Sequence, residues 1–132
     1  SSEMIENLIQ NLIAISLGTM LFFSFVIAPV IFKVLDANNA GKFVRKIFPH
    51  YYLINLIILS IAMLLLFYIS SVNYDFYITL VITILFAFSL FILMPLINKF
   101  KDNKEEKKFK YSHALSAIIN FIQIIGLIYL IF

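Results

Sequence analysis

Two histidines offer the most readily used chemistry in this sequence, and each stands at the start of a long apolar segment. His50 follows Phe48-Pro49, and His113 follows a lysine-rich stretch. Imidazole is a common metal ligand and changes its charge near neutral pH. Four-helix bundles hold haem and metal ions between such side chains on facing helices. We therefore take His50 and His113 as candidate cofactor-binding residues, with haem or a metal ion as the candidate ligand.

Two other interpretations of the histidines stay open, because no third ligand accompanies them in a fixed position. Helix N-termini and nearby cations attract anions, so the same region is suited to an anionic lipid headgroup. The cations that would contact such a headgroup are Lys42, Arg45, Lys46, Lys108 and Lys110. In the third interpretation the histidines lie at the membrane interface, cap their helices and bind nothing.

A polar stripe runs through the last apolar segment. Ser116, Asn120 and Gln123 follow His113 at spacings that place all four on one face of a helix. Asn55, in the second apolar segment, is a further candidate member of this polar membrane stripe. Asparagine and glutamine hydrogen-bond between membrane helices, so the stripe indicates either polar contacts that hold a bundle together or a path for a substrate.

Small residues and prolines indicate where helices pack closely. The candidate packing positions are Ala14, Gly18, Pro29, Thr79, Thr83 and Pro95. Small side chains let membrane helices approach one another. Counted at 1.5 Å per residue, Gly18 and Gln123 both fall near the middle of a bilayer, so we expect them to face each other. No Asp, Glu, Lys or Arg lies inside an apolar segment, which removes the residues that carboxylate-based proton coupling and voltage sensing use.

The elements that position these residues follow from the composition. Of 132 residues, 63% are hydrophobic and 13% are charged. A soluble domain is about 45–50% apolar and about 25% charged, so a soluble enzyme and a nucleic-acid binder are both excluded as leading interpretations. The chain has no cysteine, which excludes disulfides, iron–sulfur centres and thiol catalysis. No nucleophile–base pair, carboxylate pair or phosphate loop points to an enzyme.

Four apolar segments are each about long enough to cross a bilayer as a helix. The sequence therefore predicts an all-α integral membrane four-helix bundle made of two antiparallel hairpins, with residues 1–132 as a single transmembrane domain. The expected helices cover about 7–33, 49–70, 76–99 and 111–132, joined by basic segments 33–48 and 99–112. Within the first basic segment we expect a short amphipathic helix at the membrane interface.

The basic residues also predict an orientation. All ten Lys and Arg lie in the two basic segments. Basic loops stay in the cytoplasm, so we expect both termini outside the cytoplasm and a bacterial inner membrane as the location. The lipid bilayer and anionic headgroups are then the expected partners, together with a second copy or another membrane protein, and no nucleic acid.

The two hairpins resemble each other. Pro29 and Pro95 each stand four residues before a lysine, and a histidine begins the next apolar segment in both halves. This pattern would fit a duplication with two parallel repeats, as in some transporters, although the sequence alone does not favour it. The alternative is that proline is simply tolerated near the ends of membrane helices.

Several motifs are similar to those of the transmembrane protein 205-like family. They are Gly18-x-x-x-Phe-Phe-x-Phe-x-x-Ala-Pro29-x-x-Phe32, Ala40-Gly41, Phe48-Pro49-x-Tyr51-Tyr52, Met94-Pro95 and Phe109-x-x-x-His113-x-x-Ser116-x-x-x-Asn120. The resemblance covers nearly the whole chain and implies a small four-helix integral membrane protein without a settled activity. A looser similarity to small four-helix haem- or copper-associated membrane proteins supports the histidine hypothesis. The absence of histidine from the first apolar segment counts against haem.

Three functions remain open at this point. The first, which the sequence favours, is a structural or interaction protein, such as an oligomer or a subunit of a larger membrane complex, without evident enzymatic activity. The second is a haem- or metal-binding redox protein that uses His50 and His113. The third is a small transporter or lipid-handling protein that uses the polar stripe and the basic residues.

Overall fold

The computed structural model describes residues 2–132, which form four long helices and no strand. Each of the four is long and apolar enough to cross a membrane, so the prediction of an all-α four-helix membrane bundle is confirmed. The first is built from α1 (Ser2–Phe22), η1 (Phe23–Ile27) and α2 (Ala28–Val34), and the second is α3 (Ala37–Tyr68). The third is built from α4 (Tyr74–Phe88), η2 (Ser89–Leu93) and α5 (Met94–Asp102), and the fourth is α6 (Glu106–Ile131).

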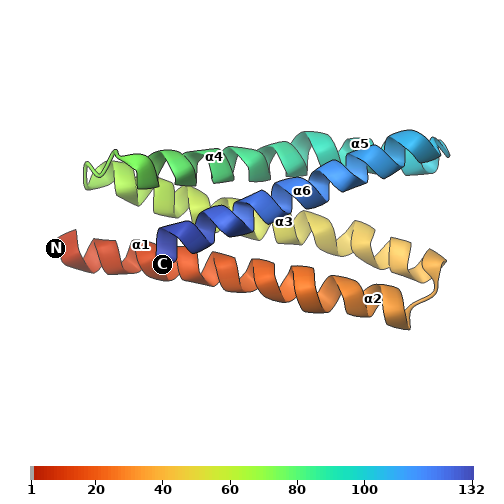
Figure 1. The fold of residues 1–132 in the computed structure, drawn as a ribbon, viewed down its shortest axis with the longest axis horizontal. Coiled ribbons are helices and arrows are strands. Elements are labelled where there is room, and N and C mark those ends of the chain that lie inside the picture. Colours follow the sequence, from red (N-terminus) through yellow and green to blue (C-terminus); the bar gives the residue numbers. More distant parts are fainter. Residues whose placement is uncertain (1) are drawn as a thin grey trace.

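Both termini lie at one end of the bundle, beside the turn that joins α3 to α4 (Figure 1). We call this the terminal end. The connections 35–36 and 103–105 lie at the opposite end, which we call the basic end because the lysines and the arginine gather there. α6 runs obliquely across the bundle, from a position beside α5 at the basic end to one beside α1 at the terminal end (Figure 1).

The first basic segment differs from its expected form. Where we expected a connection over 33–48 with a separate interfacial helix, α3 begins at Ala37 and continues through Pro49. Asp36 caps this helix, since its carboxylate accepts a hydrogen bond of 2.8 Å from the backbone N–H of Asn39. A proline inside a helix frees the carbonyl four residues earlier. That carbonyl belongs to Arg45, an exposed residue at the basic end where water can reach it.

A wide turn of π-helix precedes the proline in both hairpins. The N–H of Ala28 bonds to the carbonyl of Phe23, and the N–H of Met94 bonds to the carbonyl of Ser89, each five residues back. Pro29 and Pro95 follow directly. Proline lacks an N–H and its ring clashes with the carbonyl four residues before it, and a wider turn relieves that clash. The matching position of the two turns supports the duplication.

Packing is uneven along the bundle. The largest fully buried side chains lie in the middle and toward the terminal end, namely Phe86, Met20, Leu59, Leu127, Gln123, Asn55, Thr79, Ser16 and Ser89. At the basic end, α5 contributes no buried residue and α2 contributes only Ile31. We call the two regions the closed half and the open half. The open half therefore leaves space between the helices.

Candidate functional site

The open half contains a cavity of about 630 Å³ at the basic end, which we call the vestibule. Residues of α2, α3, α5 and α6 line it. Its walls are mostly apolar, with Phe32, Phe48, Met94, Ile97 and Phe109 among them. Its cationic lining residues are Lys42, Arg45 and Lys101. An apolar cavity with a few charged groups is the usual form of a ligand site.

A second cavity of about 260 Å³, which we call the crevice, adjoins the vestibule on the side toward the middle of the bundle. The two cavities share the lining residues Ala28, Phe48, Tyr52, His113 and Ser116. Phe25 on η1 and Phe121 on α6 also line the crevice, and their side chains are 61% and 55% exposed. These residues mark a side opening of the crevice between the first and fourth membrane helices.

A polar network closes the inner part of the crevice. The hydroxyl of Tyr51 donates a hydrogen bond of 2.5 Å to Oδ1 of Asn120, and Nδ2 of Asn120 donates one of 2.9 Å to Oγ of Ser24. The ring of Tyr51 stacks on Phe23 with 4.2 Å between the ring centroids. The network joins the first, second and fourth membrane helices and places polar atoms beside an otherwise apolar crevice.

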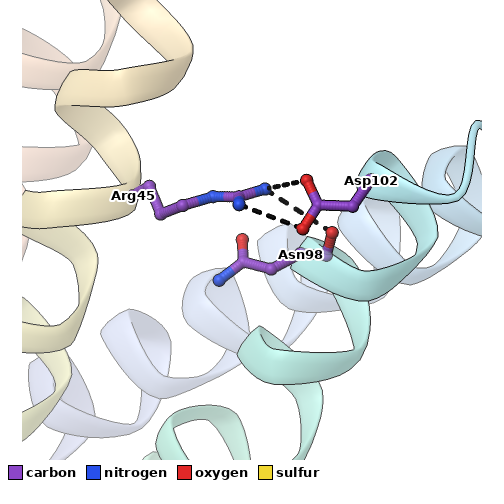
Figure 2. Close-up of polar contacts among 3 residues, drawn as sticks. All are labelled: Arg45, Asn98 and Asp102. Atoms are coloured by element: carbon purple, nitrogen blue, oxygen red, sulfur yellow. Dashed lines mark hydrogen bonds and ion pairs between the residues drawn. The ribbon is translucent and has the colours of Figure 1, made fainter.

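One ion pair crosses the rim of the vestibule. Nη2 of Arg45 lies 2.9 Å from Oδ1 of Asp102, and Nη1 donates a second hydrogen bond of 3.1 Å to Oδ2 (Figure 2). Nη2 also lies 3.5 Å from the carbonyl oxygen of Asn98. Within residues 2–132, this is the one ion pair that connects α3 to α5. Both side chains are exposed, so the pair stabilises the fold only slightly.

The structure separates the two candidate histidines. His113 lines both the vestibule and the crevice, and its ring stacks on Phe109 with 5.8 Å between centroids. His50 is exposed and lines neither cavity. In the described part of the chain, no group of three or more His, Cys, Asp or Glu residues is placed to hold a metal ion. His50 and His113 therefore do not line a common cavity.

Only some of the candidate headgroup cations lie at the vestibule. Lys42 and Arg45 line the vestibule, whereas Lys46, Lys108 and Lys110 do not. Lys108 lies 3.4 Å from a carboxylate oxygen of Glu105, on its own helix. Lys101 lines the vestibule, although sequence reasoning did not single it out. The signal that would have found it is its spacing of four residues from Ile97 and three from Asn98, which continues one face of a helix.

The polar stripe serves two purposes. Ser116 and Asn120 line the crevice. Asn55 is fully buried, where it accepts a hydrogen bond of 2.7 Å from Ser16 and donates one to the carbonyl of Tyr51. Gln123 is also fully buried and donates a hydrogen bond of 3.0 Å to the carbonyl of Ile82, and its Oε1 has no partner among the described residues. Asn55 and Gln123 thus hold helices together away from the cavities, whereas Ser116 and Asn120 face a cavity and Asn120 also connects helices.

Some of the candidate packing residues are buried between helices and others are exposed on the outside of the bundle. Thr79 and Thr83 are buried, and their hydroxyls donate to carbonyls of their own helix. Pro29 and Pro95 are exposed after the wide turns. Ala14 and Gly18 are exposed as well, and nothing lies within 4 Å of a Cβ built on Gly18. The expectation that Gly18 faces Gln123 is therefore wrong.

Gly126 provides the close approach instead. A Cβ built on it would lie 2.7 Å from Cδ1 of Ile82, so the Ile82 side chain of α4 packs directly against the backbone of α6 at this point. Sequence reasoning did not single out Gly126, although it follows Gln123 by three residues and so shares its face of the helix.

Comparisons with known proteins agree with this account of a membrane protein without an assigned chemistry. Residues 11–106 match the family model described as a domain of unknown function (DUF4149). An uncharacterized protein of Aquifex aeolicus (strain VF5) is 34% identical over 117 residues, which cover 87% of this chain and 85% of the relative. No solved structure matches the chain significantly. The chain thus belongs to the DUF4149 family.

Proposed function

We propose that this protein is a lipid-handling membrane protein that holds one membrane lipid in its open half. The observation that carries the proposal is that the vestibule and the crevice adjoin each other and share five lining residues. The lipid chains cover the apolar walls of the crevice and of the vestibule, and the headgroup lies against the cationic residues of the vestibule. Ligand cavities usually measure about 300–1,000 Å³, and the vestibule, at about 630 Å³, is of this size.

The side opening supports a ligand that arrives from the membrane. Phe25 and Phe121 line the crevice and are exposed on the outside of the bundle, where lipid chains surround a membrane helix. A lipid can therefore pass between the first and fourth membrane helices without leaving the bilayer. The polar network around Asn120 limits how far its chain penetrates the bundle.

The same proposal includes the finer predictions about location and relatives. The basic end faces the cytoplasm and both termini lie outside it, in the inner membrane of a bacterium, as the distribution of Lys and Arg favours. The similarity in motifs supports a relation to the transmembrane protein 205-like family. A role as an oligomer or as a partner in a membrane complex stays a prediction, and the exposed Ala14 and Gly18 are the residues through which it would act.

The test is to fill the crevice. Ala117 lines the crevice, whereas Ala114 is exposed on the same helix and lines neither cavity. The purified protein is transferred to a mild detergent, and the bound lipid is counted by native mass spectrometry. We expect the wild type and Ala114→Phe to retain one lipid and Ala117→Phe to lose it. Equal lipid retention by Ala117→Phe and the wild type would contradict the proposal.

A further inference from the structure

The vestibule carries an excess of positive charge that nothing within it neutralises. Its charged lining residues are Lys42, Arg45 and Lys101, and no carboxylate lines it. Arg45 is already paired with Asp102, which lies just outside. Neither Lys42 nor Lys101 forms an ion pair in the described residues, and the ammonium of Lys101 lies 4.9 Å from the centre of the Phe109 ring. Two ammonium groups therefore remain for a ligand.

The two lysines stand on different walls. Lys42 belongs to α3 and Lys101 belongs to α5, and the Arg45–Asp102 ion pair joins these same helices at the rim (Figure 2). Each of these two walls therefore offers one ammonium group to a ligand in the vestibule. Because Asp102 neutralises Arg45, the charge preference of the vestibule depends on the two lysines.

We infer, on the basis of the proposed function, that the vestibule selects lipids with an anionic headgroup and binds the lipid phosphate between Lys42 and Lys101. The apolar walls favour a phosphate attached to acyl chains over a free anion. Phe32, Phe48 and Phe109 line the same cavity as the lysines, and a soluble ion would leave their rings uncovered. Burial of apolar surface by the attached chain stabilises the complex.

The experiment compares two lipids with identical acyl chains. The full chain is placed in nanodiscs of equal parts phosphatidylglycerol and phosphatidylcholine, and the retained lipid is identified by native mass spectrometry. A lysine near an anionic headgroup favours binding by about fivefold, so the wild type retains phosphatidylglycerol in excess. We expect the double variant Lys42→Gln/Lys101→Gln to retain the two lipids equally.

Two control variants separate a site from general surface attraction. Lys46→Gln/Lys110→Gln removes the same charge from exposed residues that do not line the vestibule, and it keeps the preference. Lys99→Gln/Lys107→Gln likewise removes two exposed lysines that do not line the vestibule, and it also keeps the preference. Equal loss of the preference in the Lys46/Lys110 and Lys42/Lys101 variants would overturn the inference.

The remaining outcomes distinguish the inference from the function on which it rests. If the wild type retains both lipids equally, the inference fails while the lipid-handling proposal stands. If it retains no lipid, the proposed function itself fails. Addition of inorganic phosphate is a further arm: displacement of phosphatidylglycerol by millimolar phosphate would assign the vestibule to a free anion and overturn the inference.

Discussion

The closed and open halves of this bundle are built from the same four helices, yet their side chains are used differently. In the closed half, Leu59, Phe86 and Leu127 have no exposed surface, and buried polar groups such as Ser16 and Asn55 pair with each other. In the open half, polar and charged side chains line two adjoining cavities. Polar residues of this bundle therefore connect helices in the closed half and line cavities in the open half, and Asn120 does both.

The oblique path of α6 is the cause of this difference. α6 packs beside α1 toward the terminal end and beside α5 toward the basic end (Figure 1). At the basic end α6 lies beside α5 and away from α2. The side chains of these helices therefore do not fill the space between them, and the vestibule forms there. The wide turns before Pro29 and Pro95 occur in both hairpins, so they do not by themselves distinguish the two halves.

The largest expected effect is on packing in the closed half. Leu59→Ala should lower the free energy of unfolding by about 2 kcal/mol, near the lower end of the range for buried leucine, because lipid already surrounds this side chain in the unfolded state. Phe32→Ala in the open half should cost less than about 1 kcal/mol, because the ring is 60% exposed. Unfolding in mixed micelles, followed by circular dichroism, measures both.

Leu64→Ala is the matched control for this comparison, since Leu64 lies on the same helix as Leu59 and is 62% exposed. It should behave like the open-half variant. If Leu59→Ala and Leu64→Ala shifted the unfolding midpoint equally, the distinction between the halves would be lost.

The second prediction compares two glycines. Gly126→Leu should destabilise the protein by about 1–3 kcal/mol, as overpacking does, because Ile82 lies 2.7 Å from a Cβ at this position. Gly18→Leu should be neutral or slightly stabilising, because its surroundings are open and leucine favours a helix over glycine. The same unfolding measurement applies. A larger cost at Gly18 would indicate that a partner packs on this face.

The third and smallest effect concerns the ion pair at the rim. Arg45→Gln should lower the free energy of unfolding by less than about 1 kcal/mol, since both partners are exposed. It should nevertheless widen the basic end, because the ion pair joins α3 to α5. The chain has no cysteine, so two introduced cysteines carry spin labels at defined places. Labels at Lys46 and Lys99 should show a broader distance distribution with longer distances.

A second label pair tests whether this widening is local. Labels at Tyr68 and Tyr129, which are exposed and lie toward the terminal end on α3 and α6, should keep their distance distribution in Arg45→Gln. Equal broadening in both pairs would mean that the variant loosens the whole bundle and that the two halves do not respond separately.

The sequence predicted the helices well, because apolar length alone decides whether a segment crosses a membrane. It did not predict how far α3 extends toward the basic end. The helix passes Pro49 because the carbonyl freed by this proline belongs to the exposed Arg45. The low helix propensity of proline predicts a break in the helix at Pro49. Because water can reach the freed carbonyl, the loss of its hydrogen bond costs little here.

The candidate site was only half predictable. Spacing placed Ser116, Asn120 and Gln123 on one face of a helix, but the oblique path of α6 turns Gln123 into the closed half and leaves the other two at the crevice. The rotation of His50 away from the cavities depends on how α3 packs, which a single helix does not reveal. Lys101 is one of six lysines in the second basic segment, and their spacing alone does not show which of them lines the vestibule.

One measurement tests the central claim most directly, namely that the open half holds a lipid. The protein is placed in nanodiscs that contain a phospholipid with a photoreactive group in its acyl chain. The sample is illuminated, and the labelled peptides are identified by mass spectrometry. We predict that adducts concentrate on crevice residues such as Phe25, Ala117 and Phe121. Adducts spread evenly over all exposed apolar residues, including Leu64 and Ile84, would contradict it.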